Sequence, residues 1–319
     1  MIKKIGILTS GGDAPGMNSA LIGAIRSGIN ANKEMYVIYD GYKGLIEGKI
    51  QKVNKDTFKD KMNQGGTVIK TARLPEFKEL SVRQKAVEIL RKEGIDALIV
   101  IGGDGSYMGA KKLTELGINC IGLPGTIDND IASTDYTIGF DTALNTVVNE
   151  IDNIVDTSSS HHRCAVVEIM GNRCADLTLY AGIATNADII LTKDHPFTTD
   201  EVIETLNRKK KDDQDYALVL VSEKFMDTNG LVEEIKKRTS WDTRLTVLGH
   251  TQRGGRPSAM ERVNAVYMAD YAIKLLNEGK GGMCVGIRNS KPVAYPIEEA
   301  LKLENNLHKE LYKLHDDVK

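Results

Sequence analysis

The sequence predicts an α/β fold, and three observations support this prediction. Short apolar runs of strand length alternate with longer helical stretches, which is typical of proteins with mainly parallel sheets. Acidic turns that contain glycine follow several of the apolar runs, and such folds bind ligands outside the carboxyl ends of their strands. A chain of 319 residues, 41% of them hydrophobic, is long enough to bury the cores of about two domains or lobes.

The expected strands and helices alternate along most of the chain. Several of the helices have Ser, Thr or Asp at or near their first turn, where these side chains satisfy free backbone N–H groups. No linker rich in proline, glycine or serine separates two halves, so the lobe boundary is placed at a break near Gly139 and a return near Thr251. The expected strands are 5–9, 35–39, 97–101, 120–123, 165–169, 189–192, 217–221 and 245–248, and the expected helices are 17–30, 82–93, 141–155, 199–210 and 257–277.

Charge and cysteine content argue against several classes of protein. With 42 Lys and Arg against 44 Asp and Glu, the net charge of -2 disfavours a general affinity for nucleic acid or for an anionic membrane. The N-terminal apolar run reaches glycine too soon for a signal peptide, and no apolar run approaches membrane-spanning length. The cysteines form no C-x-x-C pair, which favours free thiols over disulfides or zinc ligands; they are Cys120, Cys164, Cys174 and Cys284. We therefore expect a cytoplasmic protein.

Two glycine-rich turns indicate a phosphate site. Gly11-Gly12-Asp13 and Gly102-Gly103-Asp104-Gly105-Ser106 each follow an apolar run. Glycine removes side chains where a polyphosphate must approach, so that backbone N–H groups and the start of the next helix face the anion. Asp104 is then free to hold magnesium. A purely structural role for these turns is the alternative; a dinucleotide fingerprint fits poorly, because Gly109 comes one residue late, and a Walker lysine motif is absent.

A third turn, Pro124-Gly125-Thr126-Ile127-Asp128-Asn129-Asp130, offers two carboxylates two residues apart. An Asp in such a loop can accept a proton from a sugar hydroxyl, and Asp128 and Asp130 are the candidates. The alternative is an ordinary turn, because Asp and Asn favour local hydrogen bonds to the backbone.

A basic motif follows the expected strand 245–248. The segment Gly249-His250-Thr251-Gln252-Arg253-Gly254-Gly255 presents His250 and Arg253 at a spacing that lets both meet one phosphate. Arg163, at the end of a polar segment that contains two adjacent histidines, is a further candidate cation. A loop with exposed charge is the alternative.

With these motifs together, the chain resembles the bacterial ATP-dependent 6-phosphofructokinases over essentially its full length. The resemblance rests on Thr9 to Asn18, Gly102 to Ser106, Pro124 to Asp130 and Gly249 to Gly255. It implies two α/β lobes with the active site between them. The larger, ATP-binding lobe would comprise residues 1–139 and 252–302, and the smaller lobe, which binds fructose 6-phosphate, would comprise residues 140–251 and 303–319. It also implies a homotetramer whose active sites are shared between subunits.

The resemblance also implies a role for each site residue. Asp128 would be the general base, helped by Thr126 and Arg73, and Asp104 would lie near Mg²⁺. The implied ATP contacts are Gly12, Arg73, Leu74, Gly103, Asp104, Gly105 and Ser106. The implied sugar-phosphate contacts are Thr126, Asp128, Asp130, Met170, Gly171, Asn172, Glu223, His250 and Arg253, with Arg163 and Arg244 supplied by a neighbouring subunit. Family members that use pyrophosphate differ at Gly105 and Gly125, so the resemblance implies ATP as the donor.

The chain departs from the family pattern at two places. Asn172 stands where the family has arginine, and Arg173, one place later, compensates only if the backbone shifts, because neighbouring residues of a strand point to opposite faces. The family's pocket for ADP or phosphoenolpyruvate aligns with Ile22, Arg26, Val155, Asp212, Gln214 and Tyr216, of which only Arg26 is basic, while Asp60 and Asp188 remain. We therefore expect the usual allosteric control to be lost or weakened.

Several other functions compete with an active kinase. A catalytically weak family member that serves as a binding or regulatory subunit is suggested by Asn172, although Asp104, Asp128, Arg73 and Arg253 are all retained. A lipid or NAD kinase with a Gly-Gly-Asp-Gly turn would leave the second aspartate loop and the Gly249 to Gly255 motif unexplained. A nicotinamide-dependent oxidoreductase fits less well.

Overall fold

The computed structural model describes residues 2–304 and 308–318, and the chain forms two compact units. The first unit contains Met1–Ile127, Ile131–Thr142 and Arg253–Glu304, and the second contains Asp128–Asp130, Ala143–Gln252 and Asn305–Lys319. The segment 128–130, placed by sequence in the larger lobe, therefore groups with the second unit. Residues 305–307 and 319 of the expected 303–319 segment, and residue 1, lie outside the described residues.

The first unit is built on a mixed, mostly parallel sheet. Within the described residues it has eight strands in the order β12-β11-β5-β4-β1-β2-β3, with the short β6 beside β5. Among the described strands of this sheet, only the β2–β3 and β11–β12 pairs are antiparallel. The central strand β4 is buried along its whole length, as expected for a strand covered on both faces. The strands are β1 (Lys4–Thr9), β2 (Glu34–Ile38), β3 (Ile50–Val53), β4 (Ala97–Gly102), β5 (Asn119–Thr126), β6 (Ile138–Gly139), β11 (Met283–Arg288) and β12 (Lys291–Pro296).

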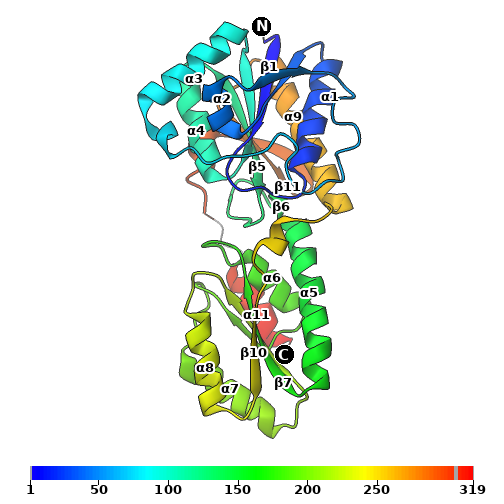
Figure 1. The fold of residues 1–319 in the computed structure, drawn as a ribbon, viewed down its shortest axis with the longest axis vertical. Helices are drawn as coiled ribbons and strands as arrows, with labels where there is room; N and C mark the ends of the chain where they lie inside the picture. The colour runs from blue at the N-terminus through cyan, green and yellow to red at the C-terminus, as the bar shows by residue number, and fades with distance from the viewer. Residues whose placement is uncertain (1, 305–307, 319) are drawn as a thin grey trace. The chain divides into compact units, whose positions relative to one another are not determined.

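Helices cover both faces of this sheet (Figure 1). Helices α1 and α9 pack against each other along one face, where Gly23 of α1 lets the backbones approach closely. Helices α2, α3 and α4 cover the opposite face over a cluster that includes Leu90, Val100 and Tyr107. The helices of the unit are α1 (Met17–Asn30), α2 (Gly41–Glu47), η1 (Pro75–Lys78), α3 (Leu80–Glu93), α4 (Asp104–Glu115), α9 (Ala259–Asn277) and α10 (Ile297–Ala300).

The second unit has a fully parallel sheet in the order β10-β7-β9-β8. Helices α7 and α8 pack together on one face over a cluster that includes Val166, Val219 and Trp241, and α6 and α11 lie on the other (Figure 1). Its elements are α5 (Phe140–Ser160), β7 (Arg163–Ile169), α6 (Asp176–Ala184), β8 (Ile189–Leu191), α7 (Thr199–Lys211), β9 (Ala217–Ser222), α8 (Thr228–Arg238), β10 (Asp242–Val247), η2 (Gly249–Arg253) and α11 (His308–Asp317). Helix α5 begins in the first unit and continues into the second.

The structure confirms the α/β class and the expected elements, with ends that differ by a few residues. The expected helix 199–210 begins as predicted, because the Thr198 side chain and Glu201 form a reciprocal capping box. The four cysteines are free, and Cys120, Cys164 and Cys284 are buried. Within the described part of the chain, no helix is both long and apolar enough to cross a membrane.

Candidate active site

The first two glycine turns lie side by side in the first unit because β1 and β4 are parallel neighbours. Ser106 Oγ donates a hydrogen bond of 3.1 Å to the carbonyl oxygen of Ser10. A Cβ atom on Gly102 would come within 2.4 Å of that same carbonyl oxygen, so only glycine allows this approach. Thr71 Oγ1 also donates to the carbonyl oxygen of Gly11, at 2.9 Å. The turns are thus fixed to one another at the carboxyl edge of the sheet.

The middle turn opens directly into helix α4, whose first turn contains Asp104. A Cβ atom on Gly105 would meet nothing within 4 Å, and one on Gly103 would meet only Thr126, at 3.8 Å. The space above these glycines is therefore open to a ligand, and the backbone N–H groups of the helix start favour an anion there. The surrounding protein partly desolvates the Asp104 carboxyl and raises its pKa above the ordinary value.

Arg73 and Leu74 lie on the segment that enters η1. Leu74 packs against the hydrophobic cluster beneath α2 and α3, whereas Arg73 is exposed. The preceding residues are fastened next to the first turn, since Thr9 Oγ1 donates to the carbonyl oxygen of Lys70 at 2.7 Å. This places Arg73 in the same region of the first unit as Gly12.

Arg253 also belongs to the first unit. A Cβ atom on Gly12 would lie 3.2 Å from Nη1 of Arg253, so the guanidinium rests against the first glycine turn. His250, three residues earlier, belongs to the second unit. The expectation that both side chains meet one phosphate stays a prediction.

The third turn divides between the units after Ile127. Thr126 ends β5, and its carbonyl oxygen accepts a hydrogen bond from Thr137 Oγ1 at 2.7 Å. Asp128 is half-buried and Asp130 is exposed, while Asn129 between them is buried and has a left-handed backbone with φ of 54°.

In the second unit, the predicted sugar-phosphate residues follow three neighbouring parallel strands. Met170 and Gly171 follow β7, Glu223 follows β9, and His250 lies in η2 after β10. One carboxyl oxygen of Glu223 accepts hydrogen bonds from the backbone N–H groups of Gly171 and Asn172, at 3.3 and 2.8 Å. Since β7 lies between β9 and β10, these side chains gather at one edge of the sheet.

Gln252, a residue that sequence reasoning did not single out, connects two of these segments. It is fully buried, and its Oε1 accepts the N–H of Met170 at 3.1 Å while its Nε2 donates to the carbonyl oxygen of Gly249 at 3.0 Å. The one sequence signal that could have pointed to Gln252 is its place in the Gly249 to Gly255 motif. Gln252 therefore fixes the backbone on which Met170 and His250 stand.

Arg163 and Arg244 lie away from this edge. Arg163 is the first residue of β7, and Arg244 is the third residue of β10. Both bind the Asp242 carboxyl, Arg163 at 2.8 Å and Arg244 at 3.1 Å. The hydrogen bond from Arg163 and the charge of Arg244 lower the pKa of Asp242 below its ordinary value. Arg163 is six residues from the carboxyl end of β7, roughly 20 Å along the strand.

Glu261 has a buried carboxyl group, which the sequence did not reveal. It accepts hydrogen bonds from the backbone N–H and from Oγ1 of Thr142, both at 3.2 Å, in the first turn of α5. Burial raises the pKa of Glu261 to about 7. Ser258, which precedes α9, donates to Asp141 in the same turn of α5. The start of α9 thus anchors the start of α5.

The donor set around Asp104 is consistent with a magnesium ion held mainly by phosphates. Among residues 2–304 and 308–318, no group of three or more His, Cys, Asp or Glu side chains could hold a metal ion. Mg²⁺ in phosphoryl-transfer enzymes is usually bound by one or two carboxylates together with waters and substrate phosphates. One carboxylate beside an open glycine turn fits that requirement.

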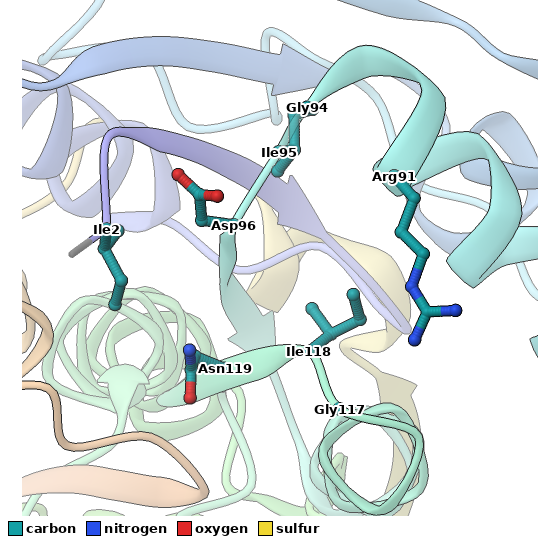
Figure 2. A pocket seen from close by; sticks show the side chains of 8 residues that line it. All are labelled: Ile2, Arg91, Gly94, Ile95, Asp96, Gly117, Ile118 and Asn119. Atoms are coloured by element: carbon teal, nitrogen blue, oxygen red, sulfur yellow. The ribbon is translucent and has the colours of Figure 1, made fainter.

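A surface cavity of about 390 Å³ lies at the opposite, amino edge of the first sheet (Figure 2). Its lining comes from the starts of β1, β4 and β5 and includes Arg91, Asp96 and Asn119. The Asp96 carboxyl already accepts the backbone N–H groups of Lys3 and Lys4, at 2.7 and 3.0 Å. This cavity contains none of the predicted site residues.

Comparison with known proteins identifies the family. A family model described as phosphofructokinase matches residues 4–276. An ATP-dependent 6-phosphofructokinase of Vibrio campbellii is 52% identical over 319 residues, and one of Vibrio cholerae serotype O1 is 51% identical, with 100% of both chains covered in each case. The chain belongs to the phosphofructokinase family.

Solved structures of phosphofructokinases have the same fold. That of Saccharomyces cerevisiae matches with a TM-score of 0.88 and 33% identity over 99% of this chain, which spans about half (47%) of the yeast chain. A pyrophosphate-dependent phosphofructokinase from Marinobacter aquaeolei matches with a TM-score of 0.88, 19% identity and coverage of 97% of this chain and 86% of that chain. At that identity the second likeness shows the fold alone.

Asn172, which stands where the family has arginine, is not a strand residue, and this changes what is expected of Arg173. Asn172 lies beyond the end of β7, in a turn with φ of 57°, so alternation along a strand does not decide where Arg173 points. A different cation lies at Asn172 instead, because Lys224 Nζ donates to its Oδ1 at 2.8 Å.

The residues aligned with the family's effector pocket also contain an unexpected pairing. Lys209 Nζ lies 2.5 Å from Oδ1 of Asp188, whose other oxygen accepts the N–H of Leu218 at 2.7 Å. Lys209 also lies over the Tyr216 ring, 5.2 Å from its centroid. Asp188 remains as expected, and Lys209 of α7, which is not among the residues aligned with the pocket, supplies a cation to it.

Proposed function

We propose that the chain is an ATP-dependent 6-phosphofructokinase of glycolysis. It transfers the γ-phosphoryl group of ATP to the 1-hydroxyl of fructose 6-phosphate and yields fructose 1,6-bisphosphate and ADP. The observation that carries this proposal is the set of glycine and aspartate turns at the carboxyl ends of β1, β4 and β5, in a chain 52% identical over its whole length to a protein named for this activity.

In this mechanism Asp128 takes the proton from the 1-hydroxyl while the sugar oxygen bonds to the γ-phosphorus and the bond to the β,γ-bridging oxygen breaks. Arg73 and Thr126 stabilise charge on the transferring group, since phosphoryl transfer depends mainly on positioning and electrostatics. The backbone of Gly12 and of 103–106 holds the ATP phosphates, with Leu74 on the nucleotide.

Asp104 would hold Mg²⁺ together with the phosphates, and the ion supplies neutralisation of phosphate charge when bound. The sugar phosphate is held by Met170, Gly171, Asn172, Glu223, His250 and Arg253, with Asp130 beside the base. ATP is favoured over pyrophosphate because the space over Gly105 is open to the rest of a nucleotide.

We propose further that the enzyme is a cytoplasmic homotetramer in which Arg163 and Arg244 serve the site of a neighbouring subunit. The position of Arg163 supports this proposal, because within one chain it lies roughly 20 Å along β7 from Met170 and Gly171. No role in binding nucleic acid or membrane is proposed.

A coupled assay with ATP, Mg²⁺ and fructose 6-phosphate, run beside a pyrophosphate control, tests the proposal. We expect turnover with ATP and little with pyrophosphate. Tight ligand binding without turnover would instead favour the second candidate, a binding or regulatory subunit, which the amide at Asn172 suggests. Turnover with pyrophosphate alone would contradict the donor assignment.

A further inference from the structure

The turn Asp128–Asp130 is held to the second unit by a buried hydrogen bond. Asn129 is only 4% exposed, and its Nδ2 donates to Oδ2 of Asp176 at 2.7 Å. Asp176 is 2% exposed and stands in the first turn of α6, 47 residues away along the chain. Its other carboxyl oxygen accepts a hydrogen bond from Cys174 Sγ at 3.1 Å.

Burial of a carboxyl group is costly unless its oxygens are hydrogen-bonded, and here both of them are. The start of a helix also favours negative charge. Asn129 has the left-handed backbone that Asn tolerates better than most residues, and its amide is fixed by Asp176. Because Asp128 and Asp130 flank Asn129 directly, the backbone at this residue sets the direction of both carboxyl groups.

We propose that Asp176 is a positioning residue for the reaction, and that it acts through Asn129 to aim the Asp128 carboxyl at the sugar hydroxyl. This inference rests on the proposed function, in which Asp128 is the general base. A small displacement of a catalytic group lowers turnover strongly, whereas ATP contacts made by the first unit are unaffected. Asp176 therefore controls kcat and not the KM for ATP.

The test is a set of variants assayed for kcat and for both KM values. Asn129→Gly removes the amide but still permits a left-handed backbone, and Asp176→Ala removes the acceptor. Each should lower kcat about 10- to 100-fold with the KM for ATP within about twofold of wild type. The kcat of the double variant should be no lower than that of the less active single variant, because both changes break the same interaction.

Two further variants separate positioning from general stability. Asp176→Asn keeps one acceptor oxygen for Asn129 and should recover most of the lost kcat. Thr178→Val is the matched control, since Thr178 is fully buried on the same helix and its hydroxyl has no hydrogen-bond partner among the described residues. It should leave kcat unchanged even if the urea midpoint shifts.

Several outcomes would overturn the inference. These are a folded Asn129→Gly enzyme within threefold of wild-type kcat, additive losses in the double variant, or equal losses in Asp176→Ala and Thr178→Val. If Asp176→Ala does not fold, Asn129→Gly and Asp176→Asn decide the question.

Failure of the proposed function is recognised separately. Asp128→Asn should lose about 10²–10⁴-fold in kcat, and an inactive wild type or an active Asp128→Asn would contradict the proposed chemistry. Hydrogen–deuterium exchange of the peptide 126–131 then tests the positioning without any assay. Faster exchange in Asn129→Gly and Asp176→Ala than in wild type and Thr178→Val supports it, and unchanged exchange overturns it.

Discussion

At the scale of single residues, the choice of phosphoryl donor can be tested at Gly105. The first atom of a side chain fits there without a clash, since a Cβ atom would meet nothing within 4 Å. Gly105→Asp should therefore fold normally and place a second carboxylate beside Asp104, close to the expected phosphates. We expect kcat/KM for ATP to fall at least about tenfold, because like charges repel, with the KM for fructose 6-phosphate little changed.

The control for this experiment is Gly105→Ala, which adds bulk without charge. A replacement at Gly125 is less informative, because a Cβ atom there would lie 2.8 Å from the Met17 side chain and 3.2 Å from the backbone nitrogen of Gly102. Gly125→Lys would thus disturb the core as well as the site. Unchanged ATP kinetics in Gly105→Asp would show that this glycine does not set the donor.

The binding of the sugar phosphate can be tested at Lys224. Its Nζ donates a hydrogen bond to the side-chain oxygen of Asn172, which stands in the place of the family arginine. If Lys224 supplies the missing cation, Lys224→Gln should raise the KM for fructose 6-phosphate roughly tenfold, the order expected for a charge-assisted hydrogen bond. Adding Asn172→Arg to Lys224→Gln should restore a low KM. Lys237→Gln, at an exposed lysine of α8, is the control.

Steady-state kinetics for both substrates measure the effect. An equal change in the KM for ATP, or a failure of Asn172→Arg to rescue, would rule out a cationic role for Lys224. A low kcat in wild type that Asn172→Arg raises would instead indicate that Asn172 has weakened catalysis.

At the scale of elements, Glu261 connects the start of α9 to the start of α5. Its titration should make the free energy of unfolding depend on pH. Its pKa is about 7 in the folded chain against an ordinary value of 4.5, so the folded state binds the proton more tightly. Stability from this group is fully present below about pH 4.5 and is lost as pH rises to about 7. The loss is at most about 3.5 kcal/mol, at roughly 1.4 kcal/mol for each unit of pKa.

Urea unfolding at pH 5 and pH 8 measures this effect. Wild type should lose more stability than Glu261→Gln between the two values, because glutamine does not titrate. Comparing the two proteins at each pH cancels the contribution of other groups. A pH dependence that is the same in both would show that Glu261 is ionised in the folded chain at pH 5.

At the scale of the whole molecule, the proposed sharing of active sites between subunits predicts complementation between two inactive variants. Asp128→Asn lacks the base and Arg163→Ser lacks the cation supplied to a neighbour, so each homotetramer should be nearly inactive. Co-expressed subunits should recover activity, because some sites combine an intact Asp128 with an intact Arg163 from another chain. Sedimentation velocity checks the tetramer, and the two variants mixed without subunit exchange are the control. No recovery in verified hybrids would place Arg163 outside the neighbour's site.

Regulation is a second property of the whole molecule. ADP and phosphoenolpyruvate should each change the half-saturating concentration of fructose 6-phosphate less than about twofold, because an effector shifts an equilibrium only through differential affinity for two states. Ile22, Val155 and Gln214 provide no cations, and Asp188 is already paired with Lys209.

Initial rates at subsaturating fructose 6-phosphate, with either effector titrated to millimolar levels, measure the response. A tenfold shift would mean that another set of residues has rebuilt the site. Arg208 and Lys211, which line a surface cavity of about 540 Å³ together with Arg238, would then be the first to replace.

The order of strands and helices, and the turns that carry chemistry, were readable from the sequence. A continuous apolar run as short as Ala97–Gly102, rich in Val and Ile, favours a buried strand, and a glycine-rich acidic turn after such a run favours a ligand site. The strands β3, β6, β11 and β12 were missed: β3 and β12 lie at the two edges of the sheet, β6 has only two residues, and β11 has no acidic turn after it.

Only the tertiary structure decided which distant groups support the site. The sequence around Ser258 has the spacing of a capping box, and Ser258 does accept the N–H of Glu261, but the Glu261 carboxyl binds Thr142, 119 residues away. Gln252 reaches Met170 across 82 residues, and Asp176 reaches Asn129 across 47. Local pattern encodes backbone conformation and burial, whereas the partner of a buried polar group depends on how the elements pack. For that reason the sequence determined the fold and the chemical groups, and the tertiary structure decided what holds them in place.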